Sequence, residues 1–428
     1  MRDDQATPRR RESGSVSRLW RRLLPLHVAV MLQGFMLWTP VEKLFMTEIG
    51  FDATSVGVMA AAYSALVPLV EIPSGILADR WSRRGVLVVA SVALALSALI
   101  GGLSTGVDSY IGSALVLGVY FAMYSGTMEA VVYDTVLDET GDSDDFERRI
   151  GRVRFVESVS LVVSSLIGGW VAGIAGARVT YFLTVPFALL SIVAYLRFRE
   201  PLLHRLSEPT SLRTHLVVTF RTVTRRRRLL PIITLAALSA VTLQLIFEFG
   251  PLWLVAFAVP AVFYGPYWAG LVSTLGLGGV LAGWIRLDRP ATSAAAGAAM
   301  TAAALVVTMT DSVAVVTVGH IVIALAMVAI GIHVSRMLHD EIPSTVRTGV
   351  ASGVSAISWI VFLPIALGFG LISTTGGLPA AGWFLVALAA LTGALLTTTT
   401  LRHRGPEPTR DAGSFADGSG GEAAAATR

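Results

Sequence analysis

Charged residues are scarce in this 428-residue chain, and cysteine is absent. Charged side chains make up 14% of the chain and apolar ones 54%, whereas a soluble domain carries about 25% charged residues. The surface therefore cannot mostly face water, and lipid must cover much of it. Without cysteine there is no disulfide, no thiolate catalysis and no zinc–thiolate site. No Asp/His cluster has metal-ligand spacing either, so we expect no metal and no cofactor.

Lysine is almost absent as well, because Lys43 is the only one. A phosphate-binding P-loop needs a lysine after a glycine-rich loop, and Lys43 follows no such loop. ATP hydrolysis of that type is therefore excluded, and so is a lysine Schiff base at any other position. The formal net charge of +4 would suit a nucleic-acid partner, but the distribution of the basic residues argues against it.

Long apolar runs dominate the chain, and we count twelve that approach the ~20 residues a membrane-spanning helix needs. They cover residues 23–46, 54–78, 86–104, 110–134, 155–175, 179–197, 229–249, 252–284, 291–309, 313–334, 349–373 and 379–400. Backbone groups that face lipid must pair within their own segment, which forces these runs into helices. The eighth run is overlong. We expect Pro260 and Pro266 to break it, with the seventh helix extending to about residue 257.

Basic residues are distributed very unevenly between these runs. With the N-terminus inside, the cytoplasmic segments hold every basic residue except Lys43 and Arg178. The positive-inside rule therefore predicts a multi-pass protein of the cell (plasma or inner) membrane with both termini cytoplasmic. The arginine run 225–228 precedes the seventh helix, where it would meet anionic headgroups. We expect membrane lipid, and no nucleic acid, as its partner.

The turn between the second and third runs carries an unusual cluster of charges. It reads Glu71-Ile-Pro-Ser-Gly75-Ile-Leu77-Ala-Asp79-Arg80-Trp-Ser-Arg83-Arg84. Topology explains the arginines, but it explains neither the acid nor the order Gly-x-Leu-Ala-Asp. The turn resembles the signature loop of the major facilitator superfamily of transporters, although that family usually has glycine where Ser82 stands.

The resemblance implies an all-α integral membrane fold with twelve transmembrane helices in two six-helix bundles. It also implies alternating access, and we expect a monomer. The predicted parts are a cytoplasmic N-terminal segment (1–22), an N-terminal bundle (23–197), a basic cytoplasmic loop (198–228), a C-terminal bundle (229–401) and a disordered cytoplasmic tail (402–428). The run 279–283 echoes 75–79 about half a chain later, either as a trace of duplication or by chance.

The family pattern assigns roles to particular residues of the turn. In the family the acid and arginine of this loop join a charge cluster that latches the two halves in the outward-open state, and here Asp79 and Arg83 match them. Asp134 ends the fourth run and is the candidate partner of Arg83. Arg347 stands before the eleventh run, where family members often carry Pro and then Arg. Gly75 would allow close helix approach.

Two departures from the family put drug–proton antiport in doubt. The fourth run lacks the mid-membrane arginine that is common in proton-coupled members. The fifth run is glycine-rich between residues 164 and 173, but it has no proline there, so the antiporter signature is incomplete.

Acids inside a membrane are costly, so each one is a functional candidate. Burial of a carboxyl group favours its protonated form, and proton coupling needs reversible protonation. The candidates for proton coupling or substrate binding are Glu42, Glu71, Glu129, Gln244 and Glu248.

Each acid also has another interpretation. Glu42 could pair with Lys43 or lie among headgroups. Glu71 and Glu129 could be structural partners of arginines. Glu248, just before a Gly-Pro pair, could mark an outer gate.

Aromatic residues recur within the spans and could line a large cavity. The candidates are Phe35, Trp38, Tyr63, Tyr124, Trp253 and Trp359. An aromatic pocket with one buried acid would suit lipophilic, often cationic compounds. Any single aromatic residue could instead face lipid or the membrane interface.

The sequence thus predicts a secondary transporter, not an enzyme, that moves a small molecule by alternating access. Within this class we favour export of lipophilic compounds in exchange for protons. The alternative is proton-linked uptake or facilitated diffusion of a polar metabolite, although no sugar, peptide or nitrate motif supports it. A membrane-embedded enzyme or a non-transporting scaffold is a further alternative. An enzyme, however, would need clustered His, Asp and Glu at a membrane face, and the acids here are dispersed.

Overall fold

The computed structural model of the protein describes residues 8–142, 145–201, 229–341 and 347–403. All regular structure in these ranges is helical. The N-half consists of α1 (Pro8–Gln33), η1 (Thr39–Val41), α2 (Glu42–Glu48), α3 (Ala53–Arg80), α4 (Arg83–Leu103), α5 (Val107–Thr140), α6 (Phe146–Ala175) and α7 (Ala177–Arg197). The C-half consists of α9 (Leu229–Phe249), α10 (Pro251–Ala256), η3 (Ala261–Phe263), α11 (Tyr264–Trp284), α12 (Pro290–Met309), α13 (Val313–Glu341) and α14 (Arg347–His403).

The helices correspond to the twelve predicted spans. Within the described ranges nine helices are long and apolar enough to cross a membrane. In this count α9 and α10 form one helix, and α14, which covers two spans, is also counted once. The 57-residue α14 covers two spans, because Gly377 interrupts it with φ 76° and ψ 171°, a conformation that favours glycine. Helices α1 and α11 complete the set of twelve. The fold is therefore the predicted all-α membrane architecture with two six-helix bundles.

Two expectations about helix ends need correction. The first run, 23–46, is not one helix, because α1 ends at Gln33 and the chain turns through η1 before α2 begins. The overlong eighth run is broken between Ala256 and Tyr264 as expected, with Pro260 at the break. Pro266, however, lies in the first turn of α11, where a helix needs no backbone N–H, so it does not break the helix.

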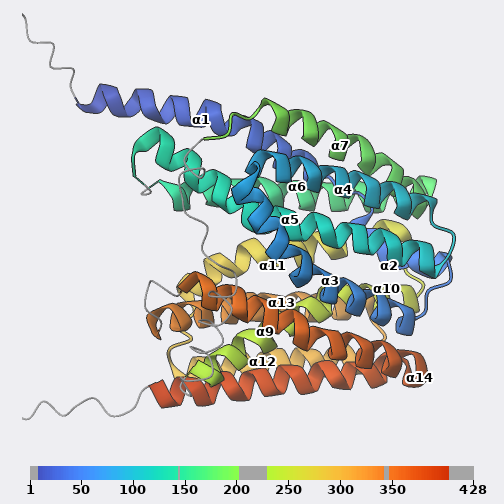
Figure 1. The fold of residues 1–428 in the computed structure, drawn as a ribbon. Helices are drawn as coiled ribbons and strands as arrows, with labels where there is room; N and C mark the ends of the chain where they lie inside the picture. The colour runs from blue at the N-terminus through green and yellow to red at the C-terminus, as the bar shows by residue number, and fades with distance from the viewer. Residues whose placement is uncertain (1–7, 143–144, 202–228, 342–346, 404–428) are drawn as a thin grey trace, which may run out of the picture.

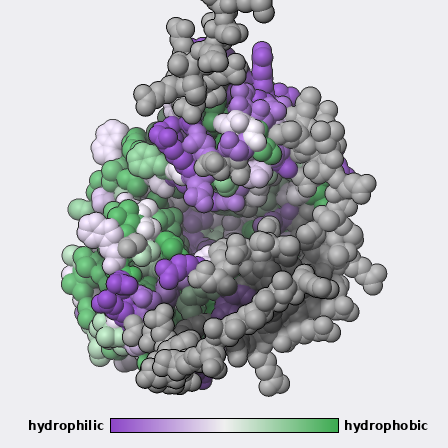
Figure 2. Space-filling model, turned by 90° about the vertical axis from the view of Figure 1, so that its left-hand side faces the viewer, coloured by the Kyte–Doolittle hydropathy of each residue, from purple (hydrophilic) through white to green (hydrophobic). Residues whose placement is uncertain are grey.

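The two halves lie one above the other in Figure 1, the N-half above the C-half. The beginning of α1, the turn between α3 and α4, and the end of α14 lie on the left-hand side, which we call the Arg83 end. Helices α2 and α10 lie on the right-hand side, which we call the Lys43 end. Figure 2 looks onto the Arg83 end and shows hydrophilic side chains gathered there around a recess.

The halves contact each other closely near the Lys43 end, where small residues face one another. A Cβ atom added to Gly57 of α3 would lie 2.6 Å from the carbonyl oxygen of Ala366 of α14. A Cβ atom on Gly169 of α6 would lie 2.6 Å from the backbone nitrogen of Gly265 of α11. Only glycine permits such close approach of two helix backbones. Gly169 and Gly173 of the fifth run therefore lie at an interface between the halves, whereas Gly168 packs against Leu37 within the N-half.

Candidate functional site

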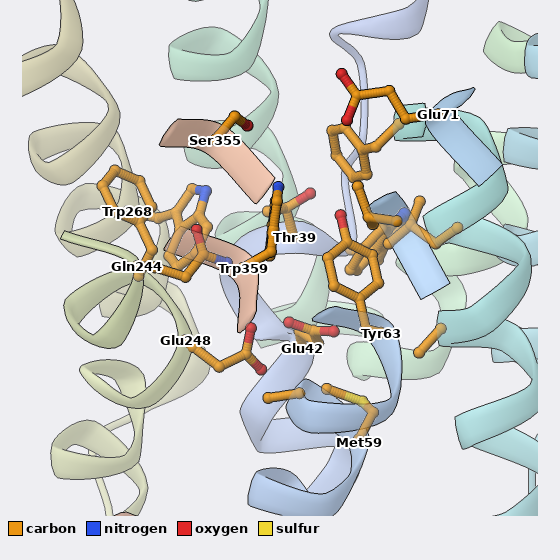
Figure 3. Close-up of a pocket in the computed structure, with 17 residues that line it drawn as sticks. Thr39, Glu42, Met59, Tyr63, Glu71, Gln244, Glu248, Trp268, Ser355 and Trp359 are labelled. Atoms are coloured by element: carbon orange, nitrogen blue, oxygen red, sulfur yellow. The ribbon is translucent and has the colours of Figure 1, made fainter. Parts of the chain in front are cut away.

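A cavity of about 500 Å³ lies between the two halves. The N-half contributes residues of α3 and α5 and of the segment from Trp38 to Glu42, and the C-half contributes residues of α9, α11 and α14. Seven of the residues predicted from the sequence line it: Trp38, Glu42, Tyr63, Glu71, Gln244, Glu248 and Trp359. Figure 3 shows these polar and aromatic side chains converging from both halves.

Four predicted residues do not line this cavity. The Phe35 ring stacks on Phe187, with ring centroids 5.0 Å apart, and Tyr124 stacks on Tyr120 in the core of the N-half. The Trp253 ring is buried edge-on against His320 in the C-half. Glu129 is half exposed and forms an ion pair with Arg154, so it matches the structural interpretation, a partner for an arginine.

Sequence reasoning missed several cavity residues, although one signal was present. Met59, Tyr63, Val67 and Glu71 all line the cavity, and they follow one another at intervals of four along α3. This spacing places side chains on one face of a helix. Thr39, Phe121, Phe247, Trp268 and Ser355 also line the cavity, and no local pattern singles them out.

Two cavity acids share the single lysine of the chain. Lys43 Nζ lies 2.5 Å from Glu248 Oε1 and 2.9 Å from Glu42 Oε2. Only 1% of Lys43 is exposed. Lys43 and Glu42 belong to α2 of the N-half and Glu248 belongs to α9 of the C-half, so this ion pair joins the halves at the Lys43 end. The sequence suggested the Lys43–Glu42 contact as one alternative but did not predict the contact with Glu248.

Glu42 is further held by two buried tyrosines. The Tyr110 hydroxyl donates to Glu42 Oε1 over 3.1 Å, and it lies 2.6 Å from the Tyr181 hydroxyl. The Trp38 ring stacks on Tyr181. These contacts fix the Glu42 carboxylate within the N-half, whereas Glu248 pairs, among the described side chains, with Lys43 alone.

Glu71 occupies the opposite part of the cavity, away from Glu42 and Glu248 (Figure 3). It lies on α3, in the part of the helix that leads to the Arg83 end. Within the part of the chain that the structure describes, no cationic side chain pairs with its carboxylate. A half-buried acid without a cation in a membrane protein is costly, and it marks a candidate site for proton or substrate binding.

The signature turn builds a polar cluster within the N-half. Arg83 Nη1 lies 2.5 Å from Asp134 Oδ2, so the predicted partners are in contact. Ser82 caps α4 by accepting a hydrogen bond from the Gly85 backbone N–H. Its hydroxyl also donates to Glu200 Oε2 over 2.5 Å. Serine thus performs a capping role that the glycine usual in the family cannot, and Glu200 is a partner that the sequence reasoning missed.

The other predicted residues of this end are arranged less tightly. Arg84 donates to the Phe198 carbonyl oxygen, and Arg80 and Leu77 are exposed. A Cβ atom added to Gly75 would meet no described atom within 4 Å, so the described residues make no close helix approach at Gly75. The side chains of Asp79 and Arg347 lie outside the described residues, and their predicted roles stay predictions.

One further acid was overlooked. Glu157 lies near the start of α6, inside the fifth predicted span, beside Arg154 and Tyr124. Its position within an apolar run was a signal that sequence reasoning could have used. Because it does not line the cavity, we do not place it in the candidate site.

Comparison with known proteins agrees with this architecture. Multidrug resistance protein 1 of Bacillus subtilis (strain 168) is 24% identical over 180 residues, which are 42% of this chain and 45% of that protein. Multidrug resistance protein 2 of the same organism is 28% identical over 173 residues, 40% of this chain and 41% of that protein. The matches thus span less than half of either relative.

Solved structures show the same fold at low identity. The nucleoside transporter NupG has a TM-score of 0.72 at 14% identity, covering 90% of this chain and 99% of that chain. A bacterial homolog of the human lysosomal transporter Spinster, inward-facing and unoccupied, has a TM-score of 0.66 at 16% identity, covering 90% and 94%. The family model of the Major Facilitator Superfamily matches residues 23–363. The chain therefore belongs to the Major Facilitator Superfamily, as a multi-pass membrane transporter and not an enzyme.

Proposed function

We propose that this transporter exports small lipophilic compounds, many of them cationic, across the cell membrane in exchange for protons. The observation that carries this proposal is the cavity between the halves, which combines aromatic walls with three carboxylates. Neither a sugar-like array of hydrogen-bonding groups nor a metal site is needed to explain these residues.

The lining fits cargo of this chemistry. Trp38, Tyr63, Trp268 and Trp359 offer large apolar faces, and such faces also attract cations through their ring quadrupoles. A volume of about 500 Å³ falls in the usual range for pockets that hold drug-sized molecules. The similarity to multidrug resistance proteins supports the same class of substrate.

Glu71 is the proposed proton site. It lines the cavity and has no cationic partner among the described side chains, so it can lose and regain a proton without breaking an ion pair. Exchange of one proton for a monovalent cation moves no net charge, so the pH difference alone drives it. For a neutral cargo, one proton charge that moves through ~100 mV supplies ~2.3 kcal/mol. This energy supports an accumulation of roughly fiftyfold, which is enough for a useful exporter.

The closed end of the cavity is consistent with export. Contacts between the halves cluster at the Lys43 end. With the predicted orientation, the Arg83 end faces the cytoplasm. A cavity closed at the Lys43 end is then ready to load cytoplasmic cargo from the Arg83 end.

The test is a flux assay in proteoliposomes with an imposed pH gradient and tetraphenylphosphonium as the transported probe. We expect the gradient to drive accumulation of the probe, and Glu71→Gln to allow only downhill flux. Glu129→Gln is the matched control, because Glu129 lies outside the cavity and pairs with Arg154. Full gradient-driven accumulation by the Glu71→Gln protein would rule out Glu71 as the proton site. Absence of flux across a broad panel of lipophilic compounds would reject the proposed function.

A further inference from the structure

The contact between Lys43 and Glu248 is unusual because only one of the two residues lines the cavity. Glu248 lines the cavity, and 18% of its side chain is exposed. Lys43 does not line the cavity, and 2% of its side chain is exposed. Figure 3 shows the carboxylates of Glu42 and Glu248 turned toward each other, next to Trp359. A molecule in the cavity can therefore reach the Glu248 side chain, whereas Lys43 lies outside the cavity lining.

The geometry points to Lys43 as a tethered cation that occupies Glu248 while the cavity is empty and that a bound organic cation displaces. This inference rests on the proposed function for the cationic cargo. Displacement would remove the ion pair between α2 and α9, so that loading of the cavity releases the Lys43 end. Lys43 acts here as a positioning residue for the conformational change, and Glu248 as the cargo contact.

The charges around Lys43 favour such an exchange. One ammonium stands between two carboxylates, so the ionised cluster carries a net negative charge. Loss of one partner from a buried ion pair is costly because it leaves an uncompensated charge. This cost keeps Lys43 paired with Glu248 until another cation takes the place of the ammonium group. After displacement, Lys43 keeps Glu42 as a partner within α2. Glu248 gains the cargo cation, and no charge is left alone.

The exchange also satisfies the thermodynamic condition for a ligand-driven change. A ligand shifts a conformational equilibrium only through its differential affinity for the two states. In the closed state Glu248 is shared with Lys43, and in the open state its carboxylate is free for the cargo. A cation therefore binds the open state more tightly, whereas a neutral molecule of similar shape has no such preference. The conformational response should be selective for charge.

The chain offers a clean reporter for closure of the Lys43 end. It has no cysteine, so introduced thiols have no background. The hydroxyls of Thr54 of α3 and Thr374 of α14 lie 2.8 Å apart across the two halves. The paired substitution Thr54→Cys and Thr374→Cys should therefore cross-link under mild oxidation when this end is closed. Cross-linking rates and equilibrium binding of radiolabelled tetraphenylphosphonium are measured on the same purified protein.

We expect saturating tetraphenylphosphonium to slow cross-linking about tenfold, which corresponds to a tenfold preference for the open state. Neutral triphenylphosphine oxide at a concentration that competes for the cavity should leave the rate unchanged. In the Lys43→Met protein the rate should already be low and should no longer respond to the cation. The joint exchange of Lys43→Glu with Glu248→Lys keeps two acids and one base in the cluster, so it should restore closure. It places the base in the cavity and removes the cargo contact, so it should not restore the response to the cation.

The matched control is Arg178→Met. Arg178 is the other basic residue predicted on this side, but it donates to the Gly102 carbonyl oxygen and lies over the Phe45 ring, both within the N-half. Its removal should preserve the response to the cation. An equal loss of response in the Arg178→Met and Lys43→Met proteins would overturn the inference.

Binding and closure separate this inference from the proposed function. If tetraphenylphosphonium binds but cross-linking stays fast, or slows equally without Lys43, the displacement is wrong while the cationic cargo stands. If the cation does not bind at all, both the displacement and the cationic cargo are wrong. A response to the cation that depends on Lys43, without any proton-driven accumulation, would support the displacement and reject proton exchange.

Discussion

The two ends of this transporter use charged residues in opposite ways. At the Arg83 end the ion pairs that the structure describes stay within one half, as in Arg83–Asp134 and Arg22–Asp138. At the Lys43 end one ion pair, Lys43–Glu248, crosses between the halves, together with the Thr54–Thr374 hydrogen bond. Charges at the first end therefore brace a bundle, whereas charges at the second end hold two bundles together.

This difference separates stability from conformational equilibrium. Loss of a contact within one bundle should lower the free energy of unfolding and leave the closed state of the Lys43 end in place. Loss of a contact between bundles should change the population of that closed state and leave the fold intact. Each of the substitutions below tests one side of this distinction.

The largest effect on stability is expected from Asp134→Leu. The Arg83–Asp134 pair is mostly buried, with 13% and 12% of the side chains exposed, and loss of one partner from a buried pair costs about 3 kcal/mol. Thermal unfolding in detergent should show this loss, while cross-linking of the Thr54→Cys/Thr374→Cys reporter stays fast. Asp138→Leu is the control, because Asp138 is more exposed and Arg22 keeps Glu139. A fall in cross-linking with Asp134→Leu would contradict the division between the two ends.

The opposite result is expected from Gly57→Val. A side chain there would meet the Ala366 carbonyl oxygen of the other half, and overpacking of this kind costs about 1–3 kcal/mol. The cost falls on the closed state, so reporter cross-linking should slow while the unfolding midpoint changes little. Gly112→Val is the control, because nothing lies within 4 Å of a Cβ atom at that position. Unchanged cross-linking in the Gly57→Val protein would show that the halves do not depend on this contact.

A smaller effect is expected at the N-terminus of α3. The Asp52 carboxylate accepts hydrogen bonds from the Ser55 hydroxyl and backbone N–H, and these bonds lower the pKa of Asp52 below its ordinary value of 3.8. Asp52→Ala should cost about 1 kcal/mol at neutral pH, as loss of a helix cap does. A lowered pKa contributes stability that is full above 3.8 and is lost as the pH falls through the lowered value.

Unfolding curves of the native and Asp52→Ala proteins should therefore converge in acid. Asp108→Ala serves as the control, because Asp108 is an exposed acid in the first turn of α5 at the same end. A difference between native and Asp52→Ala curves that does not shrink as the pH falls below 3.8 would show that the cap acts through something other than the charged carboxylate.

The smallest effect is expected from Glu129→Gln. The Glu129–Arg154 pair has 50% and 62% of its side chains exposed, and exposed pairs contribute less than about 1 kcal/mol. Neither the unfolding midpoint nor reporter cross-linking should change measurably. A clear shift in either would mean that the Arg83 end has a second structural pair like Arg83–Asp134.

Much of the fold was predictable, because its signals are local. The apolar runs indicated the helices, Pro260 indicated the break in the eighth run, and the turn at Asp79 and Arg83 indicated the family. The errors came from features that length alone does not fix, such as the turn after Gln33. The candidate site was predicted less well. Seven of its residues were named. The sequence could not distinguish them from four residues that lie outside the cavity, namely Phe35, Tyr124, Trp253 and Glu129, because the orientation of a side chain depends on which helices pack together.

The sequence by itself determined that this protein is a helical membrane transporter of twelve spans, because hydrophobic length and the signature turn are properties of single segments. Only the tertiary structure decided which charges meet between the two halves. Lys43 and Glu248 are separated by 205 positions in the chain, and their contact exists because α2 and α9 approach each other at one end of the cavity. The same packing leaves Glu71 without a cationic partner among the described side chains. Pairing of charges between the halves is set by packing geometry, which no local pattern records.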